Sequence, residues 1–341
     1  MRSWLETYDL ATGKVTVVLE TDQRIEAPNW DPSGASLLIN GGGRLFRVPL
    51  DQPALVPVAS GFADRCNNDH GISPDGNWIV LSCHRGRGSE IFVMPAAGGE
   101  PALVSPEPPS WWHGWSPDGT RLVYVAARRG DRVIDVYTMP VAGGAELRLT
   151  FGEGQCDGPD YSADGTRIYY NCDRPDDGAY DHRGSGPGAR DPDGQDLGGH
   201  DPGARDSGRD GSGGREPGGP EDRAPGYGPG HRDAPPQTGG GHAQIWVMGA
   251  DGAGQRRLFA DDCVNWFPHP SPCGRHLLYL AYPPGTEGHP ADLPVALCLC
   301  DPEGGNRRRV REIIGGQGTI NVPCWAPDGS AFAYVRYEIG S

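Results

Sequence analysis

The sequence lacks several features that would place it in a class at once. No segment of its 341 residues approaches the roughly 18 consecutive apolar residues that a membrane-spanning helix requires, so we expect no membrane span. The N-terminal stretch "MRSWLETYDL" has no apolar core of the kind that secretory signals carry. We therefore expect a cytoplasmic protein, or a periplasmic one if the N-terminus of this chain is incomplete.

Positive charge is also scarce. The chain has 30 lysines and arginines against 45 aspartates and glutamates, which gives a formal net charge of −15. A nucleic-acid backbone would be repelled by such a surface, so we expect no nucleic-acid partner. Hydrophobic residues make up only 36% of the chain, which argues against a single continuous helical core.

Cysteine pairs of the C-x-x-C type are absent. The nine cysteines are scattered, and several of them lie inside expected strands: Cys83, Cys172, Cys298 and Cys300. Buried, reduced thiols are the simplest interpretation, and they agree with the expected cytoplasmic location.

Turn-forming residues, by contrast, are abundant, with 54 glycines and 34 prolines, and many of them belong to a repeated motif. Six copies occur along the chain: "NWDPSG" ending at Gly34, "GISPDG" at Gly76, "GWSPDG" at Gly119, "DYSADG" at Gly165, "HPSPCG" at Gly274 and "CWAPDG" at Gly329. A short alternating apolar run follows each copy, as in "RLVYVA", and such runs predict β-strands.

The repeat predicts an all-β, six-bladed β-propeller. Each complete unit contains four expected strands and recurs at roughly 40–45 residues, which is typical of propeller blades. The last unit stops at "AFAYVRYE", while the N-terminal segments "SWLETYDL" and "VTVVLE" supply two further strands. N-terminal strands would therefore complete the last blade. Because closure removes exposed sheet edges, we expect a monomer.

One segment interrupts the repeat in the fourth blade. Residues 174–242 are rich in Gly, Pro, Asp and Arg and contain almost no aliphatic side chains. Such a segment cannot bury enough apolar surface to offset its ordering entropy. We therefore predict a disordered insertion at 174–242, within a single propeller domain that spans residues 1–341.

The six "W-S-P-D-G … I-Y-V-M … G-G" units resemble the propeller repeats of TolB-like proteins, also called WD40-like repeats. The resemblance covers the whole chain except the insertion, and it implies a scaffold for binding without naming a reaction. TolB itself is a periplasmic protein of the Tol–Pal envelope system and has an additional N-terminal α/β domain, which we do not expect in this chain. Related repeats precede the peptidase domain of prolyl-oligopeptidase-like enzymes, but no G-x-S-x-G nucleophile motif is present here.

Polar residues are predicted to gather at one end of the ring axis. The innermost strand of a blade leads into the "SPDG" turn, so the start of that strand lies on the opposite face, which we call the mouth. Five histidines map to the mouth: His70, His113 and His269 on or just before innermost strands, and His84 and His289 in loops between second and third strands. The same mapping adds the predicted ligand-binding residues Asn68, Asp69, Trp112, Asp157, Asp160, Trp266 and Asn321.

This set of side chains favours a binding module as the function. Imidazoles, carboxylates, amides and tryptophans suit a small-molecule or saccharide ligand, or a protein segment bound at the mouth. A structural interpretation remains open, because polar residues in propeller channels also satisfy inner-strand backbone groups.

The alternative is a metal-dependent lyase, or a related enzyme, that acts on acidic oligosaccharides. Oligogalacturonate lyases are propellers with related repeats, and they hold their metal with three histidines and a glutamine. That resemblance implies a divalent metal (Mn, Ca or Zn) on His70, His113, His269 and Gln317. However, the two histidines that closely follow the family's glutamine are missing here. In this alternative His70 or His113 is the catalytic base, and Arg128 is a candidate for binding the substrate carboxylate.

Overall fold

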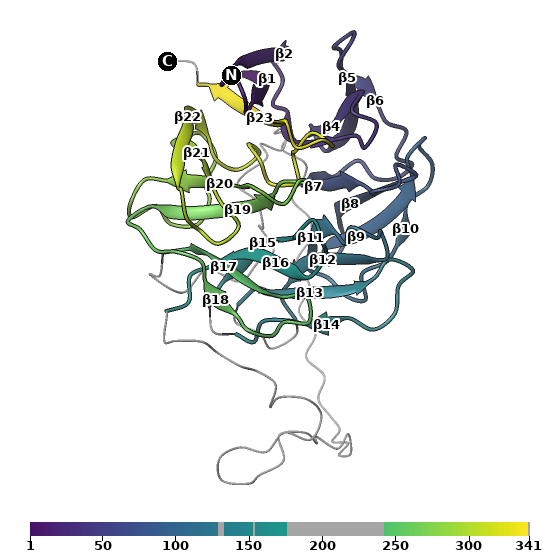
Figure 1. Cartoon of the computed structure of the whole chain (residues 1–341). Coiled ribbons are helices and arrows are strands. Elements are labelled where there is room, and N and C mark those ends of the chain that lie inside the picture. Colours follow the sequence, from purple (N-terminus) through teal and green to yellow (C-terminus); the bar gives the residue numbers. More distant parts are fainter. Residues whose placement is uncertain (129–132, 153, 176–241, 340–341) are drawn as a thin grey trace, which may run out of the picture. The chain divides into compact units, whose positions relative to one another are not determined.

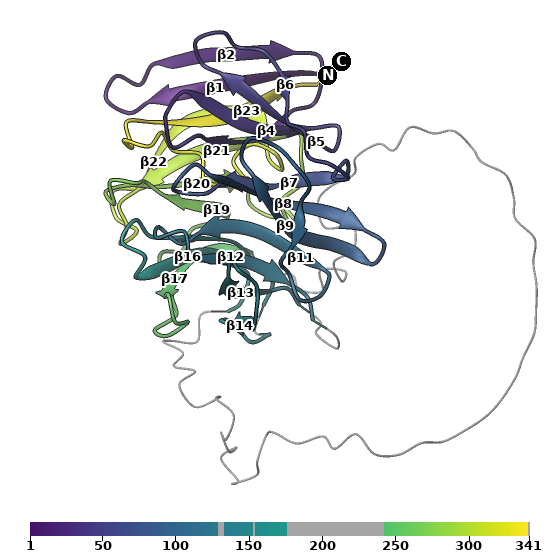
Figure 2. The same ribbon diagram turned by 90° about the vertical axis from the view of Figure 1, so that its right-hand side faces the viewer.

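The computed structural model describes residues 1–128, 133–152, 154–175 and 242–339. Within these residues all regular structure is β, with 23 strands in six sheets and no helix. Each sheet is one blade, and the blades follow one another in sequence order (Figures 1 and 2). The predicted all-β, six-bladed propeller is therefore confirmed. No helix in the described part of the chain is long and apolar enough to span a membrane.

Five blades have four strands each, ordered from the innermost strand outward. Blade one contains β3 (Glu26–Trp30), β4 (Ser36–Gly41), β5 (Arg44–Pro49) and β6 (Val56–Pro57). Blade two contains β7 (Cys66–Ile72), β8 (Trp78–Arg85), β9 (Gly88–Pro95) and β10 (Ala102–Leu103). Blade three contains β11 (Ser110–Trp115), β12 (Arg121–Ala126), β13 (Asp135–Pro140) and β14 (Leu147–Arg148).

The remaining blades complete the ring. Blade four contains β15 (Cys156–Tyr161), β16 (Arg167–Cys172), β17 (Gln244–Gly249) and β18 (Arg256–Arg257). Blade five contains β19 (Val264–Pro270), β20 (Leu277–Tyr282), β21 (Leu293–Cys300) and β22 (Arg308–Gly315). Blade six consists of β23 (Ala331–Glu338), β1 (Arg2–Asp9) and β2 (Val15–Thr21).

The "SPDG" motif forms the turn between the first and second strands of a blade. In blade two the Asp75 carboxylate accepts hydrogen bonds from the Ser73 hydroxyl (2.5 Å) and the Asn77 backbone N–H (3.0 Å). Gly76 has a φ of 75°, a conformation that glycine adopts without steric cost. The motif therefore reverses the chain within four residues and delivers it into β8.

The ring closes by joining the two ends of the chain in blade six. β1 pairs with β23 along its full length, from Arg2 opposite Glu338 to Asp9 opposite Ala331, and β23 also contacts β3 of blade one. The buried Glu6 carboxylate accepts hydrogen bonds from the Tyr334 hydroxyl (2.6 Å) and from Arg336 Nε (2.7 Å). The predicted completion of the last blade by N-terminal strands is therefore confirmed.

The expectation of reduced thiols is wrong for two of the nine cysteines. Cys156 and Cys172 form a disulfide, while the other seven cysteines are free. The physical reason is their register: the two residues lie directly opposite each other on β15 and β16, with Cα atoms 4.1 Å apart. The spacing of the two cysteines in the sequence does not indicate that they are close, because only the pairing of β15 with β16 brings their side chains together.

Most of the predicted insertion at 174–242 lies outside the described residues. Only its first two residues and His242 belong to the described part, and residues 176–241 connect β16 to β17. Arg174 is buried, stacks over the Trp246 ring at 3.9 Å and donates a 2.7 Å hydrogen bond to Gln255. Arg174, two residues after β16, thus links the end of this strand to Trp246 on β17 and to Gln255, which directly precedes β18.

Candidate functional site

In each of blades one to five, the pairing of the innermost strand with the second strand contains a register shift. The five shifts lie at a similar distance from the turn motif. The shifts occur within β3, β7, β11, β15 and β19. Three of them contain a proline, which has no N–H to donate to the ladder: Pro28, Pro159 and Pro268. The residue before each of these prolines has a positive φ: Ala27 (53°), Gly158 (56°) and Phe267 (54°). Such bulges redirect side chains and are common beside functional sites.

His70 and His113 occupy the same position of the repeat. Both lie three residues before the first residue of the turn motif, where the other four blades have Pro28, Pro159, Pro268 and Pro323. Both imidazoles are buried, but their surroundings differ. Neither ring nitrogen of His70 makes a well-aligned hydrogen bond within the described residues. Burial lowers the pKa of His70 to about 4, although nearby backbone carbonyls, including that of Leu38, partly oppose this effect. His70 is therefore neutral at pH 7.

His113 faces a carboxylate instead. Its Nε2 lies 2.9 Å from Asp157 Oδ1 on β15, the innermost strand of the next blade. Burial disfavours the charged imidazole, but contact with Asp157 outweighs burial and raises the pKa of His113. The same repeat position therefore carries a neutral histidine in blade two and a more basic one in blade three.

A chain of polar contacts continues from Asp157 across the neighbouring blades. His289 Nε2 lies 3.5 Å from Asp157 Oδ2, and His289 Nδ1 contacts the side-chain oxygen of Gln317. The Gln317 amide donates to Asn68 Oδ1 at 3.1 Å, and the Asn321 amide donates to Gln317 Oε1 at 3.0 Å. Side chains from blades two, four, five and six therefore meet in one buried network.

Two more carboxylates belong to this region. Glu26 of blade one accepts a 3.0 Å hydrogen bond from the Asn40 amide. Burial raises the pKa of Glu26, and the charge of Asp69 contributes to the same effect. We use the name axial cluster for the set of Glu26, Asn68, Asp69, His113, Asp157, His289, Gln317 and Asn321. All six blades contribute to it, and its carboxylates outnumber its imidazoles.

Asp160 and His269 form a separate buried pair. His269 Nδ1 lies 3.0 Å from Asp160 Oδ2, and His269 Nε2 lies 2.6 Å from the Ile320 carbonyl oxygen. Burial raises the pKa of Asp160, while the contact with His269 opposes this shift. Because both ring nitrogens of His269 already have partners, this side chain ties blade four to blade six through blade five.

Of the four residues that the sequence suggested as metal ligands, only His113 and Gln317 belong to the axial cluster, and they are linked through Asp157 and His289. His70 and His113 have different neighbours, both nitrogens of His269 are engaged, and Gln317 bonds to other side chains. In the described ranges, no group of three or more His, Cys, Asp or Glu side chains has an arrangement that could hold a metal ion. The residues present do not fit a metal, and we derive no chemical step through one.

Three other predicted residues have distinct surroundings. Trp266 packs against His289 with the two rings tilted by 59° and their centroids 4.3 Å apart, so it adjoins the axial cluster. Trp112 is fully buried in an apolar cluster that contains residues of blades two and three and also Ala27 of blade one and Val322, which leads into blade six. Arg128 forms a bidentate pair with Glu146, at 2.7 and 2.6 Å, beside the outermost strand β14 of blade three. The structure therefore places Trp266 against His289 of the axial cluster, buries Trp112 among apolar side chains, and pairs Arg128 with a carboxylate of its own blade.

Two members of the axial cluster were not named as site residues from the sequence. His289 was mapped to the mouth but assigned no role, and Glu26 was not considered. Glu26 lies five residues before the turn motif, a position occupied in the other blades by Asn68, Trp111, Asp157, Trp266 and Asn321. Comparison of this single repeat position across blades would have found Glu26.

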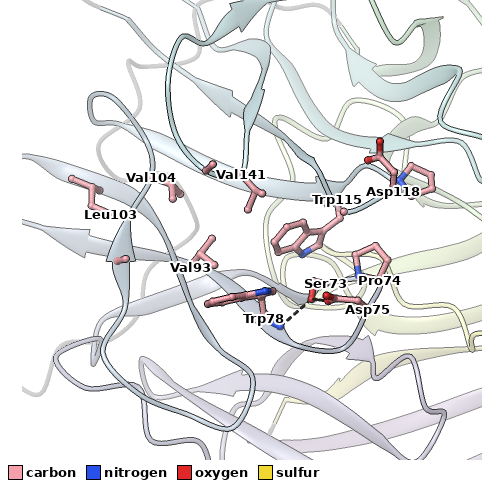
Figure 3. A pocket seen from close by; sticks show the side chains of 14 residues that line it. Ser73, Pro74, Asp75, Trp78, Val93, Leu103, Val104, Trp115, Asp118 and Val141 are labelled. Atoms are coloured by element: carbon pink, nitrogen blue, oxygen red, sulfur yellow. Dashed lines mark hydrogen bonds between the residues drawn. The ribbon is translucent and has the colours of Figure 1, made fainter.

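A hollow lies on the face that carries the "SPDG" turns. It has a volume of about 720 Å³ between blades two and three, and Figure 3 shows the Trp78 and Trp115 rings converging on it. Leu103 lines its outer side, while the carboxylates of Asp75 and Asp118 accept hydrogen bonds within their own turns. This hollow is largely apolar and contains no residue that the sequence predicted as part of a site.

Comparisons with known proteins agree with this architecture. No family model matches the chain. A protein of Agrobacterium fabrum (strain C58), described as uncharacterized protein Atu1656, is 38% identical over 339 residues, which cover 99% of this chain and 93% of that protein. A solved structure from Agrobacterium tumefaciens, provisionally described as TolB, has 37% identity and a TM-score of 0.79, covering 100% of this chain and 99% of the other.

Two more distant propellers share the fold. TolB from Acinetobacter baumannii is 14% identical with a TM-score of 0.56, covering 93% of this chain and 64% of the other. An oligogalacturonate lyase in complex with manganese is 15% identical with a TM-score of 0.49, covering 92% of this chain and 74% of the other. These likenesses concern the fold alone and carry no argument about activity.

Proposed function

Because this chain belongs to the TolB-like family of six-bladed β-propellers, we propose that it is a binding module that holds the polar part of a ligand at the axial cluster. The ligand is a small molecule or saccharide that presents hydroxyl or amine donors. The observation that carries the proposal is the convergence of buried polar side chains from all six blades, with more carboxylates than imidazoles. Carboxylate and amide oxygens accept hydrogen bonds from such donors.

Several buried polar atoms near the axis support this proposal. Three of them make no hydrogen bond within the described residues: Trp266 Nε1, Asn265 Oδ1 and Asn171 Nδ2. Most buried polar atoms in proteins bond to protein, to ordered water or to a ligand. The innermost and adjoining strands therefore offer both donors and acceptors to a polar guest.

The charge balance favours a neutral or cationic ligand over an acidic one. An acidic saccharide would approach the carboxylates of Asp69 and Asp157, and like charges repel strongly where water is excluded. Arg128, the residue suggested to bind a substrate carboxylate, is paired with Glu146 instead. These contacts weigh against the alternative of a lyase that acts on acidic oligosaccharides.

The compartment is a further part of the proposal. We propose that the protein works in an oxidising compartment such as the periplasm, because the Cys156–Cys172 disulfide is of the kind that persists there. In a reducing cytoplasm these two cysteines would remain free thiols.

The test is a binding comparison among three matched saccharide probes. Chitotriose is cationic, cellotriose is neutral and trigalacturonate is acidic, and their binding is measured by saturation-transfer NMR and isothermal titration calorimetry. We expect chitotriose and cellotriose to bind more tightly than trigalacturonate. Tighter binding of trigalacturonate, or no binding of any probe at millimolar concentration, would contradict the proposal.

A pair of glutamine variants separates binding from stability. Gln317 belongs to the axial cluster, whereas Gln255 is equally buried in blade four and bonds to Leu149 and Tyr170. Gln317→Leu and Gln255→Leu remove the same amide from two buried networks, so both should lower the melting temperature. Only Gln317→Leu should weaken binding. Equal binding by both variants would show that the ligand does not use the cluster.

A further inference from the structure

Blade two contains a pair of free cysteines at the place where blade four has its disulfide. Cys66 on β7 lies directly opposite Cys83 on β8, as Cys156 on β15 lies opposite Cys172 on β16. Cys83 and Cys172 each follow the glycine of their turn motif by seven residues (83 − 76 and 172 − 165). We call Cys66 and Cys83 the blade-two pair.

The backbone around the two cysteine pairs has the same hydrogen-bond pattern. In blade two the His84 N–H donates to the Arg65 carbonyl at 3.0 Å, and in blade four the Asp173 N–H donates to the Gln155 carbonyl at 3.2 Å. Each bond lies just outside its cysteine pair, so both pairs occupy non-hydrogen-bonded positions of the ladder. Side chains at such positions approach each other most closely, with Cα atoms about 4.5 Å apart.

We propose that Cys66 and Cys83 are a redox-active pair that closes to a second cross-strand disulfide under the conditions that keep Cys156–Cys172 oxidised. The oxidant is a disulfide of the glutathione type or the active-site disulfide of an oxidoreductase. Each pair adjoins the axial cluster, because Cys66 precedes Asn68 by two residues and Cys156 precedes Asp157 by one. The disulfides would therefore fasten the two strand segments that carry these cluster residues.

The thiols of the blade-two pair differ in acidity. A hydrogen bond with Cys66 lowers the pKa of Cys83 to about 7, while the same interaction, together with burial, raises the pKa of Cys66. Cys83 is therefore the thiol of the pair that ionises more readily, and the thiolate is the form that attacks a disulfide. Because both side chains are buried, exchange takes place during folding or through local opening at the mouth end of the blade.

The exchange balances in two steps. The Cys83 thiolate attacks one sulfur of the oxidant, its S–S bond breaks, and one thiolate leaves and takes up a proton. Cys66 then loses its proton and attacks the Cys83 sulfur of the mixed disulfide, which expels the second thiolate. The two thiol hydrogens of the protein thus end on the two thiols released from the oxidant.

Peptide mapping of the full chain tests the proposal. The protein is folded in glutathione buffers of graded oxidised-to-reduced ratio, denatured, alkylated and digested with trypsin without reduction. Cleavage after Arg65 and Arg85 leaves both cysteines in peptide 66–85. We expect this peptide to carry no alkyl group in every buffer in which the Cys156–Cys172 disulfide forms. Its mass should then be two hydrogen atoms below that of the same peptide with two free thiols.

Two controls make the result specific. Cys298 and Cys300 are buried thiols on one strand and not opposite each other, so both should stay alkylated in the same buffers. Cys83→Ser should leave Cys66 alkylated throughout. The proposal is overturned if peptide 66–85 stays doubly alkylated where Cys156–Cys172 is closed, or if Cys66 bonds to a different cysteine.

Discussion

Replacement of Asp157 by asparagine should lower the pKa of His113, because the imidazole then loses its carboxylate partner. Asp157→Asn keeps the side-chain shape and an oxygen that can still accept from the Gly158 N–H, at 2.7 Å in the native chain. It removes the charge that raises the pKa of His113 against the effect of burial. Burial then dominates, and the pKa of His113 should fall below 6.5.

His70, in the same protein, indicates how far the pKa of His113 should fall. It has the same repeat position and similar burial but no carboxylate at ion-pair distance, and its pKa is about 4 against an ordinary value of 6.5. The difference corresponds to about 3 kcal/mol of free energy against the charged imidazole. Because Asp69 also favours protonation of His113, the variant's pKa should lie between these limits.

The sign of the pH dependence follows from the raised pKa. In the native protein, protonated His113 contributes stability that is fully present below pH 6.5 and is lost as the pH rises through its raised pKa. In Asp157→Asn that contribution should disappear, so the difference in unfolding free energy between native protein and variant should be largest at acidic pH.

Histidine-selective NMR titration measures the pKa directly, and urea denaturation at pH 5.5 and pH 8 measures the stability. Asp164→Asn is the control, because Asp164 lies in an exposed turn of the same blade and should leave His113 unaffected. An unchanged pKa of His113 in Asp157→Asn, or a native value below 6.5, would refute the assigned electrostatic role of Asp157.

Two further predictions concern the scaffold. Glu6→Gln weakens the charge-assisted bonds from Tyr334 and Arg336 that close the ring, so urea denaturation should show a loss of about 3 kcal/mol. Glu20→Gln on the exposed strand β2 is the control and should change the free energy of unfolding by less than about 0.5 kcal/mol. Equal losses for the two variants would contradict the role of Glu6 in closing the ring. Gly71→Ala would place a Cβ 2.3 Å from the Trp112 ring, and the overpacking should cost about 1–3 kcal/mol. A melting temperature equal to that of the native protein would show that Trp112 moves freely.

The repeat made the fold predictable from sequence because each turn motif is a local signal. Gly76 and Asp75 specify a turn through their own φ preference and hydrogen bonds, without help from distant residues. Six such signals, the first four of them 42 to 46 residues apart, left few architectures to consider. The pairing of β1 with β23 was also accessible, since the last unit lacked two strands and the N-terminus offered two.

The axial cluster was only partly predictable, because the bulges decide where its side chains point. The sequence placed Asp157 and Asp160 together, but the register shift between them on β15 sends Asp157 toward His113 and Asp160 toward His269. In the sequence, only the repeat position of Glu26, shared with Asn68, Asp157 and Asn321, indicates that it faces the axis. The contacts among these side chains are shown by the structure alone.

Arg128 and the Cys156–Cys172 pair illustrate the same limit. Arg128 was expected to bind a substrate carboxylate, yet it makes a bidentate contact with Glu146, eighteen residues later in the chain. Cys156 and Cys172 are sixteen residues apart, and only the pairing of β15 with β16 makes them neighbours. Contacts across strands depend on register, which composition and spacing do not determine.

The position of bound cellotriose in a crystal structure of the protein would test the proposed binding site most directly. Our proposal predicts ligand density at the mouth end of the axis, within hydrogen-bond distance of Gln317, Asn68 or His289. Density confined to the hollow between Trp78 and Trp115, with none along the axis, would contradict the assignment of the axial cluster as the ligand site.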